Sequence, residues 1–149
     1  EETVKYNDLR KIGMVDKIQQ VSGNIENKNI AILGLSCKPE TDDMRESPSI
    51  DIVNGLLKLK AKIYVYDPAA MREAKKILSK KIRFSSNVQE CLKDKDILVI
   101  LTEWNEFRAL DPKLILKLMK GNIIIDLRNI FDPNEMLDEN INYVSLGRN

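Results

Sequence analysis

The feature that most constrains the fold is a series of short apolar runs, separated by segments with helical spacing. Residues 30–35 and 96–101 are the clearest runs, because apolar side chains follow one another there without alternation. Strands of this kind are covered on both faces, as in parallel sheets whose connections are helices. Right-handed crossovers then predict an α/β, Rossmann-like, doubly wound fold. We expect a six-stranded, mostly parallel sheet with helices on both faces and one helix before the first strand.

Individual elements can be assigned from the same patterns. Strands are expected at residues 30–35, 61–66, 82–84, 96–101, 122–126 and 141–144. Helices are expected at residues 4–21, from Ser47-Pro48 onwards, and at 69–79, 87–93, 112–119 and 133–137. Ser47, Asp111 and one of Ser85 and Ser86 are available as helix caps.

The length of 149 residues indicates one main domain. We expect residues 1–27 to form a helix and linker, and residues 28–149 to form the Rossmann-like domain. The chain opens Glu1-Glu2 without a methionine, which suggests a piece cut from a longer protein.

Composition excludes several classes of function. The net charge is only +1, so neither nucleic acid nor a membrane surface is an expected partner. No histidine is present, which removes histidine bases and histidine metal ligands, and we expect no metal site. Cys37 and Cys91 form neither a CxxC motif nor a disulfide framework, which favours a reducing, cytoplasmic location.

Polar residues follow the first, fourth and fifth expected strands. In the strand order 3-2-1-4-5-6 these strands are neighbours, and ligands bind beyond their carboxyl ends. Lys38, Arg45 and Arg128 are therefore expected to converge on one crevice, near the helix that starts at Ser47-Pro48. Arginine, lysine and a helix N-terminus together suit phosphate groups. Asp42, Asp43 and Glu46 would orient these cations.

Other interpretations of the same residues stay open. Charged loops are usually solvated, and Asp–Arg pairs often serve only to hold a loop in place. Trp104 can be a core aromatic, and Cys37 would need a neighbouring cation to act as a nucleophile. Asp67 suits either a ribose hydroxyl or a turn at Asp67-Pro68. The first strand leads into Gly34-Leu35-Ser36-Cys37-Lys38 rather than GxGxxG, so a standard dinucleotide grip is not expected here.

Four motifs follow one another along the chain: Gly34-Leu35-Ser36-Cys37-Lys38-Pro39-Glu40-Thr41-Asp42-Asp43-Met44-Arg45-Glu46-Ser47-Pro48, Val65-Tyr66-Asp67-Pro68, Leu101-Thr102-Glu103-Trp104-Asn105-Glu106-Phe107 and Ile125-Asp126-Leu127-Arg128-Asn129-Ile130. Together they resemble the C-terminal domain of the UDP-glucose/GDP-mannose dehydrogenase family, particularly its UDP-glucose 6-dehydrogenase branch, and the match covers about residues 28–148.

The resemblance implies that this domain binds the UDP part of a UDP-sugar, and that the whole enzyme uses NAD to oxidise the C6 alcohol to a carboxylate. Lys38 and Arg128 match residues at the sugar nucleotide, and Arg45 matches one that reaches the NAD phosphates. Glu103 and Trp104 are expected at the rim. Cys37 replaces a bulky, often aromatic residue beside the nucleotide, which departs from the family pattern.

The resemblance also places the family's NAD domain and catalytic cysteine before residue 1, so no catalytic residue is expected in this chain, which should bind but not catalyse. Its N-terminal helix resembles the end of the inter-domain helix, which implies a homodimer. The alternatives are a nucleotide-sensing module, a dimerisation module, and the equivalent domain of a UDP-N-acetylhexosamine or GDP-mannose dehydrogenase.

Overall fold

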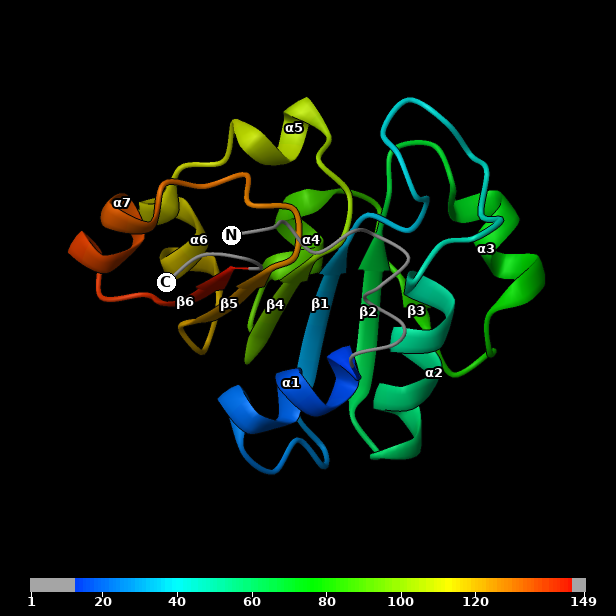
Figure 1. Cartoon of the computed structure of the whole chain (residues 1–149), viewed down its shortest axis with the longest axis horizontal. Helices are drawn as coiled ribbons and strands as arrows, with labels where there is room; N and C mark the ends of the chain where they lie inside the picture. Colours follow the sequence, from blue (N-terminus) through cyan, green and yellow to red (C-terminus); the bar gives the residue numbers. More distant parts are fainter. Residues whose placement is uncertain (1–12, 146–149) are drawn as a thin grey trace.

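The computed structural model describes residues 13–145. Their centre is one sheet of six strands in the order β3-β2-β1-β4-β5-β6, and all neighbouring strands are parallel (Figure 1). The strands are β1 (Asn29–Leu33), β2 (Lys62–Tyr66), β3 (Arg83–Phe84), β4 (Ile97–Ile100), β5 (Ile123–Asp126) and β6 (Asn142–Ser145). This confirms the predicted fold class and strand order.

Helices connect these strands in the alternation that the sequence predicts. They are α1 (Met14–Ser22), α2 (Ser49–Lys58), α3 (Met71–Ile77), α4 (Val88–Leu92), α5 (Asn105–Arg108), α6 (Pro112–Leu118) and α7 (Pro133–Asp138). None of the helices in residues 13–145 has both the length and the apolar character that crossing a membrane requires.

The core consists of two apolar layers, one on each face of the sheet. On one face, Ile32 and Val65 belong to the cluster that contains Ile18 of α1 and Leu56 of α2. On the other, Leu98 belongs to the cluster formed with α4, α5, α6 and α7. All four residues of β4 are buried, as expected for a central strand covered twice. Helices therefore cover both faces, as predicted.

The expected helix over residues 4–21 is corrected at Gly13. This glycine has φ of 67°, a left-handed conformation outside the helical range, and α1 begins only at Met14. The part of the expected helix before Gly13 lies outside the described residues. Met14 and Ile18 are buried in the domain's own core. The predicted division at residue 27 stays a prediction.

Three local expectations also differ from the structure. Asn87, rather than Ser85 or Ser86, caps α4, and its Oδ1 accepts from the backbone N–H of Glu90 at 2.8 Å. The residue directly before α2 is Pro48 rather than Ser47. The Ser47 hydroxyl donates to the carbonyl oxygen of Leu35 in the preceding loop. The short helix α5 was not expected, because four residues are too few to show helical periodicity. Asp111 does cap α6, accepting from Lys113 N at 2.9 Å.

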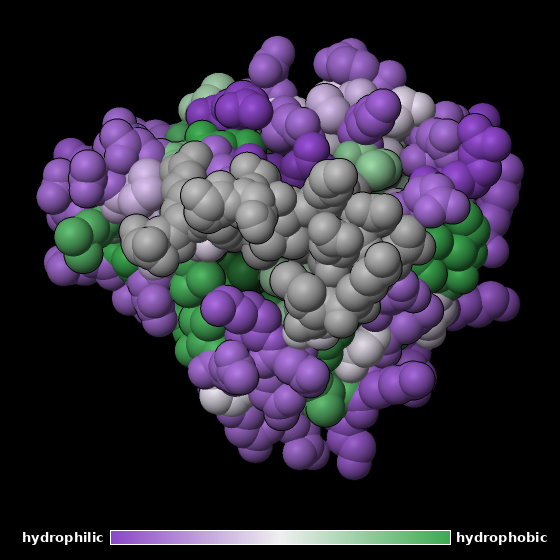
Figure 2. All heavy atoms as spheres, viewed as in Figure 1, coloured by the Kyte–Doolittle hydropathy of each residue, from purple (hydrophilic) through white to green (hydrophobic). Residues whose placement is uncertain are grey.

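Where the described residues are visible in Figure 2, most of the surface is hydrophilic, and the apolar areas are small and separate. Among the described residues, the large hydrophobic side chains with high exposure are Ile77 and Leu137. They lie on different helices, α3 and α7. Single exposed apolar residues of this kind are ordinary in globular proteins.

Candidate functional site

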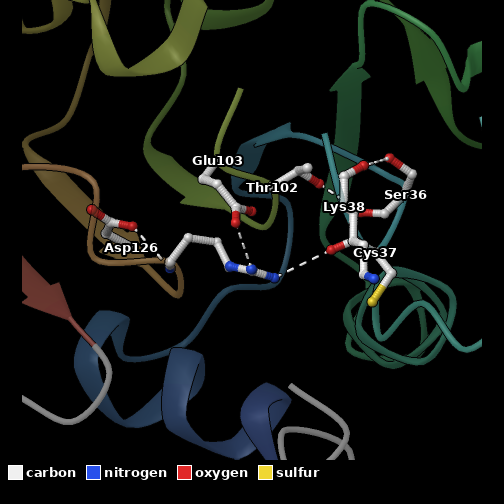
Figure 3. Close-up of polar contacts among 7 residues, drawn as sticks. Ser36, Cys37, Lys38, Thr102, Glu103 and Asp126 are labelled. Atoms are coloured by element: carbon white, nitrogen blue, oxygen red, sulfur yellow. Dashed lines mark hydrogen bonds and ion pairs between the residues drawn. The ribbon is translucent and has the colours of Figure 1, made fainter. Parts of the chain in front are cut away.

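The carboxyl ends of β1, β4 and β5 carry the polar segments that the sequence singled out. These strands are neighbours in the sheet, so the segments after them emerge at one edge. Figure 3 shows Cys37 and Lys38 from the first segment, Glu103 from the second and Asp126 at the end of β5. We call residues 34–48 the β1–α2 loop.

The two ends of the β1–α2 loop are joined to each other, and the loop is also joined to the segment after β4. The hydroxyls of Ser47 and Ser49 both donate to the carbonyl oxygen of Leu35, each at 2.6 Å. Thr102 donates from Oγ1 to the carbonyl of Ser36 at 2.7 Å, which joins the loop to the segment after β4. The loop is therefore long and polar, but its two ends are held by buried hydrogen bonds.

Gly34 makes the first turn of this loop possible. Its φ is 98°, and a Cβ at this position would lie 2.4 Å from Thr102 Oγ1 and 2.6 Å from the backbone nitrogen of Thr102. Only glycine combines this backbone conformation with such a close approach of the segment after β4. The glycine here therefore brings the first and fourth strand ends together, and it is not part of a dinucleotide cradle.

Asp67 is a structural residue at the end of β2. Its side chain is buried, and Oδ2 accepts from Leu35 N at 2.8 Å. Oδ1 accepts from the backbone N–H groups of Ala69 and Ala70, each at 2.8 Å. These bonds fit the turn role that the sequence left open and leave the carboxylate turned into the protein.

Asp126 has the equivalent role at the end of β5, and sequence reasoning did not assign it. Its Oδ1 accepts from Arg128 N at 3.0 Å, and Oδ2 accepts from Ile130 N at 2.8 Å. Oδ2 also accepts from Phe131 N and from the Tyr143 hydroxyl. The buried carboxylate therefore determines the path of the backbone on which Arg128 lies. An acidic residue directly after the apolar run Ile123-Ile124-Ile125 is the sequence signal that could have identified it.

Replacing Asp126 with asparagine should therefore destabilise the domain. The amide group would place donor hydrogens against backbone donors, at a cost of about 1–3 kcal/mol. Urea unfolding of Asp126→Asn measures this loss. Asp132 is a matched control, because it caps α7 through Asn134 N at 2.9 Å and asparagine caps helices equally well. Equal stability of the two variants would contradict the role given to Asp126.

Arg128 connects all three polar segments. Its Nη2 donates to Glu103 Oε2 at 2.8 Å, and its Nη1 donates to the carbonyl oxygen of Cys37 at 3.3 Å. The side chains of Arg128 and Glu103 are 19% and 26% exposed, so the pair lies partly within the protein. In Figure 3, dashed lines join Glu103 and Cys37 to this guanidinium group. The guanidinium is thus fixed beside the β1–α2 loop, as the predicted convergence requires.

Lys38 and Arg45 line a common hollow of about 360 Å³ within the β1–α2 loop. Its wall also includes Cys37, Pro39 and Asp43. Arg128 does not line this hollow and reaches the loop through the Cys37 carbonyl. The structure therefore places Lys38 and Arg45 in one hollow. Arg128 lies outside this hollow and contacts Cys37, which is one of its lining residues.

Asp43 orients Arg45, as expected for an acid close to a cation. Its carboxylate accepts from Nε and Nη2 of Arg45, both at 3.0 Å. This hydrogen bonding lowers the pKa of Asp43 and raises the pKa of Arg45. The Arg45 side chain is 88% exposed, so its charge faces outward from the domain.

The two rim candidates have different positions. Glu103 lies at the site through its contact with Arg128. Trp104 is 9% exposed and belongs to the apolar cluster beside Phe107, which fits the alternative of a core aromatic. The indole Nε1 of Trp104 and the Oε1 atom of Glu103 are buried, and neither has a hydrogen-bond partner in the part of the chain that the structure describes. Its contribution to a ligand site stays a prediction.

The two cysteines differ in their surroundings. Cys37 is half-buried at the hollow, whereas Cys91 is completely buried on α4. Burial raises the pKa of the Cys91 thiol to about 11, so it remains protonated at neutral pH. Among the described residues, no cluster of acidic or cysteine side chains could hold a metal ion.

Comparison with known proteins relates this geometry to a family. Residues 31–133 match the family model described as "UDP-glucose/GDP-mannose dehydrogenase family, UDP binding domain". A UDP-glucose 6-dehydrogenase of Rhizobium meliloti is 42% identical over 149 residues, covering 99% of this chain and 34% of the relative. One from Rickettsia prowazekii is 43% identical over 147 residues, covering 97% of this chain and 34% of the relative. The chain spans about a third of the length of these relatives.

Solved structures of other proteins have the same fold as this chain. A UDP-glucose dehydrogenase from Pyrobaculum islandicum has a TM-score of 0.75 at 25% identity, covering 95% of this chain and 30% of its own. An NDP-N-acetyl-D-galactosaminuronic acid dehydrogenase from Methanosarcina mazei has a TM-score of 0.76 at 23% identity, covering 95% and 29%. The second likeness supports the fold alone.

Proposed function

Because the chain belongs to the UDP-glucose/GDP-mannose dehydrogenase family and corresponds to its UDP-binding domain, we propose that it binds the UDP part of a UDP-sugar. In the larger enzyme, the sugar's C6 alcohol is oxidised to a carboxylate with NAD as the oxidant. The observation that carries this proposal is the position of Lys38, Arg45 and Arg128 around one loop at the carboxyl edge of the sheet.

The cations suit a diphosphate for different reasons. Arg128 is half-buried, and its guanidinium contacts the Glu103 carboxylate and the Cys37 carbonyl oxygen, so it offers a group of defined orientation. Guanidinium groups bind phosphate oxygens bidentately, and Lys38 adds a point charge at the neighbouring hollow. Lys38, Arg128 and the Cys37 backbone between them are the proposed contacts to UDP.

UDP-glucose is the proposed substrate of the larger enzyme. Relatives that are about 42% identical over nearly the whole chain are UDP-glucose 6-dehydrogenases. The UDP-N-acetyl-mannosamine dehydrogenase of Staphylococcus aureus shares the fold at only 23% identity. Sequence similarity therefore favours UDP-glucose over an N-acetylated sugar, and the product would be UDP-glucuronate.

The chain does not fit NAD in the standard first-turn position. The Ser47 and Ser49 hydroxyls donate to the loop's own carbonyl at Leu35, and α2 begins well beyond the end of β1. We propose that the enzyme's other domain holds NAD and that Arg45, whose guanidinium is exposed, reaches toward the NAD phosphates across the cleft. The proposal also includes a homodimer, and the NAD-binding domain as a partner that this chain contacts. The enzyme would act in polysaccharide precursor synthesis in the cytoplasm.

Titration with a nucleotide panel tests the proposal directly. We expect the chain to bind UDP and UDP-glucose more tightly than GDP, coenzyme A or NAD. Chemical-shift changes in the chain measure binding even when the affinity is low, which is expected because the proposed NAD-binding domain would form the other half of the cleft. A preference for any of the other three would favour the alternative of a sensor for a different nucleotide.

The isolated chain should not reduce NAD in the presence of UDP-glucose. Cys91 is buried as a protonated thiol, and the sequence contains no histidine that could act as a general base for Cys37. Absorbance at 340 nm over hours, with a full-length relative as the positive control, measures this activity. Turnover by the purified chain would contradict the assignment of this domain to binding alone.

Thiol labelling tests the position of Cys37. At pH 8, a thiol of pKa about 11 is ionised to roughly one part in a thousand, so Cys91 should react only after unfolding. We expect one rapidly reacting thiol in the native chain, lost in Cys37→Ser and slowed several-fold by UDP. A labelling rate that UDP leaves unchanged would argue against Cys37 at the ligand.

A further inference from the structure

The Glu103–Arg128 ion pair joins the segments that follow β4 and β5 at the proposed site. Glu103 Oε2 accepts from Arg128 Nη2 at 2.8 Å, and both side chains lie mostly within the protein. The same guanidinium donates from Nη1 to the Cys37 carbonyl. The Glu103 carboxylate therefore holds Arg128, which lies 25 residues further along the sequence, against the β1–α2 loop.

One feature of the Glu103–Arg128 ion pair does not stabilise the fold. The second carboxylate oxygen of Glu103, Oε1, is buried and has no hydrogen-bond partner among residues 13–145. A buried oxygen without a partner destabilises the folded state, and replacing a half-buried ion pair with apolar residues is often neutral or stabilising. The pair therefore contributes less to folding than its short distance suggests.

Glu103 also works against ligand binding if charge alone is considered. Its carboxylate would repel the phosphates of UDP, and it partly neutralises the cation that would attract them. A long arginine side chain, however, has many rotamers, and binding requires that they be reduced to one. Holding Arg128 in place before the ligand arrives offsets that entropic cost.

We propose that Glu103 is a positioning residue, which fixes the Arg128 guanidinium against the Cys37 carbonyl in the orientation that a nucleoside diphosphate requires. This inference rests on the proposed function. Glu103 acts through Arg128 and does not contact the ligand. Its effect on UDP binding should therefore disappear when Arg128 is absent, whereas its effect on folding should be small.

The test compares Glu103→Ala, Glu103→Gln and Glu103→Asp in the full 149-residue chain, each with and without Arg128→Ala. UDP affinity is measured by titration followed by NMR, and the melting temperature is measured in parallel. We expect Glu103→Ala to weaken UDP binding on the order of tenfold. Gln can still accept from Arg128 and should restore most of the affinity, whereas Asp is too short and should not. In the Arg128→Ala background, Glu103→Ala should change affinity less than twofold.

Other outcomes would overturn the proposal. Unchanged or tighter UDP binding by Glu103→Ala would mean that repulsion outweighs positioning. An equal loss with and without Arg128 would mean that Glu103 acts independently of it. A parallel loss of melting temperature and affinity, without rescue by Gln, would indicate a structural link between two loops. Glu73→Ala is the matched control, because its ion pair with Lys76 at 3.2 Å is exposed and lies on α3.

The design separates this inference from the proposed function. If Arg128→Ala binds UDP as tightly as the unmodified chain, or the unmodified chain does not bind UDP, the proposed function fails and the role of Glu103 fails with it. If Arg128→Ala weakens binding but Glu103→Ala does not, the proposed function stands and only the positioning role is wrong.

Discussion

Replacing Arg128 with alanine should weaken UDP binding by roughly 10- to 150-fold. Hydrogen bonds to charged groups contribute about 1.5–3 kcal/mol, and the half-buried guanidinium is only partly screened by water. Lys38 is exposed, so Lys38→Ala should have a smaller effect, about tenfold. Calorimetry or NMR titration of both variants with UDP measures these losses.

Two exposed cations on α3 serve as controls for net charge. Lys76→Ala and Arg72→Ala remove the same charge from a different part of the surface and should leave UDP affinity within twofold. Lys38→Ala should retain the unmodified chain's unfolding transition, whereas Arg128→Ala should still unfold cooperatively but with lower stability, because it leaves the partly buried Glu103 carboxylate without its cation. Equal affinity in all four variants would refute the proposed diphosphate contacts, and equal weakening in all four would show a nonspecific charge effect.

Gly34→Ala should cause the largest loss of stability of any single methyl addition at the site. A left-handed backbone costs an L-residue about 1–2 kcal/mol. A Cβ only 2.4 Å from Thr102 Oγ1 also requires the strand ends to separate, and overpacking of this kind costs about 1–3 kcal/mol more. At a few degrees per kcal/mol, the melting temperature should fall on the order of 10 °C.

Two other glycines separate the causes of this loss. Gly23 has φ of 76° but nothing within 4 Å of an added Cβ, so Gly23→Ala measures the backbone cost alone. A Cβ at Gly121 would lie 2.2 Å from the carbonyl oxygen of Asp96, and its φ is not in the left-handed range. Gly121→Ala therefore measures a steric clash alone. A Gly34→Ala variant no less stable than Gly23→Ala would contradict the close approach at Thr102.

The sheet could be predicted from the sequence because its signals are local. Each buried strand is a continuous apolar run, and the handedness of crossovers then restricts the order of the strands. The helix break at Gly13 could not be predicted with the same ease, because helices tolerate glycine and apolar spacing continues across it. Likewise α5 has only four residues and no periodicity to detect.

The site could be predicted as a gathering of cations, but its internal contacts could not. Arg128 meets the Cys37 carbonyl over 91 positions of sequence and meets Glu103 over 25. Such contacts depend on side-chain orientation across three strands, which spacing does not encode. Trp104 illustrates the same limit, because an aromatic after a strand is equally compatible with a rim and with the core where it lies.

The closure of the β1–α2 loop on Leu35 has a consequence for evolution and engineering. Because serine hydroxyls at the far end return to the carbonyl at the near end, the segment between them can change its length and chemistry while the sheet below is undisturbed. Chimaeras that exchange residues 37–46 between relatives acting on different sugar nucleotides should therefore fold. We therefore expect this edge of the molecule to tolerate exchange of the loop, and the chimaeras would measure how far residues 37–46 determine ligand preference.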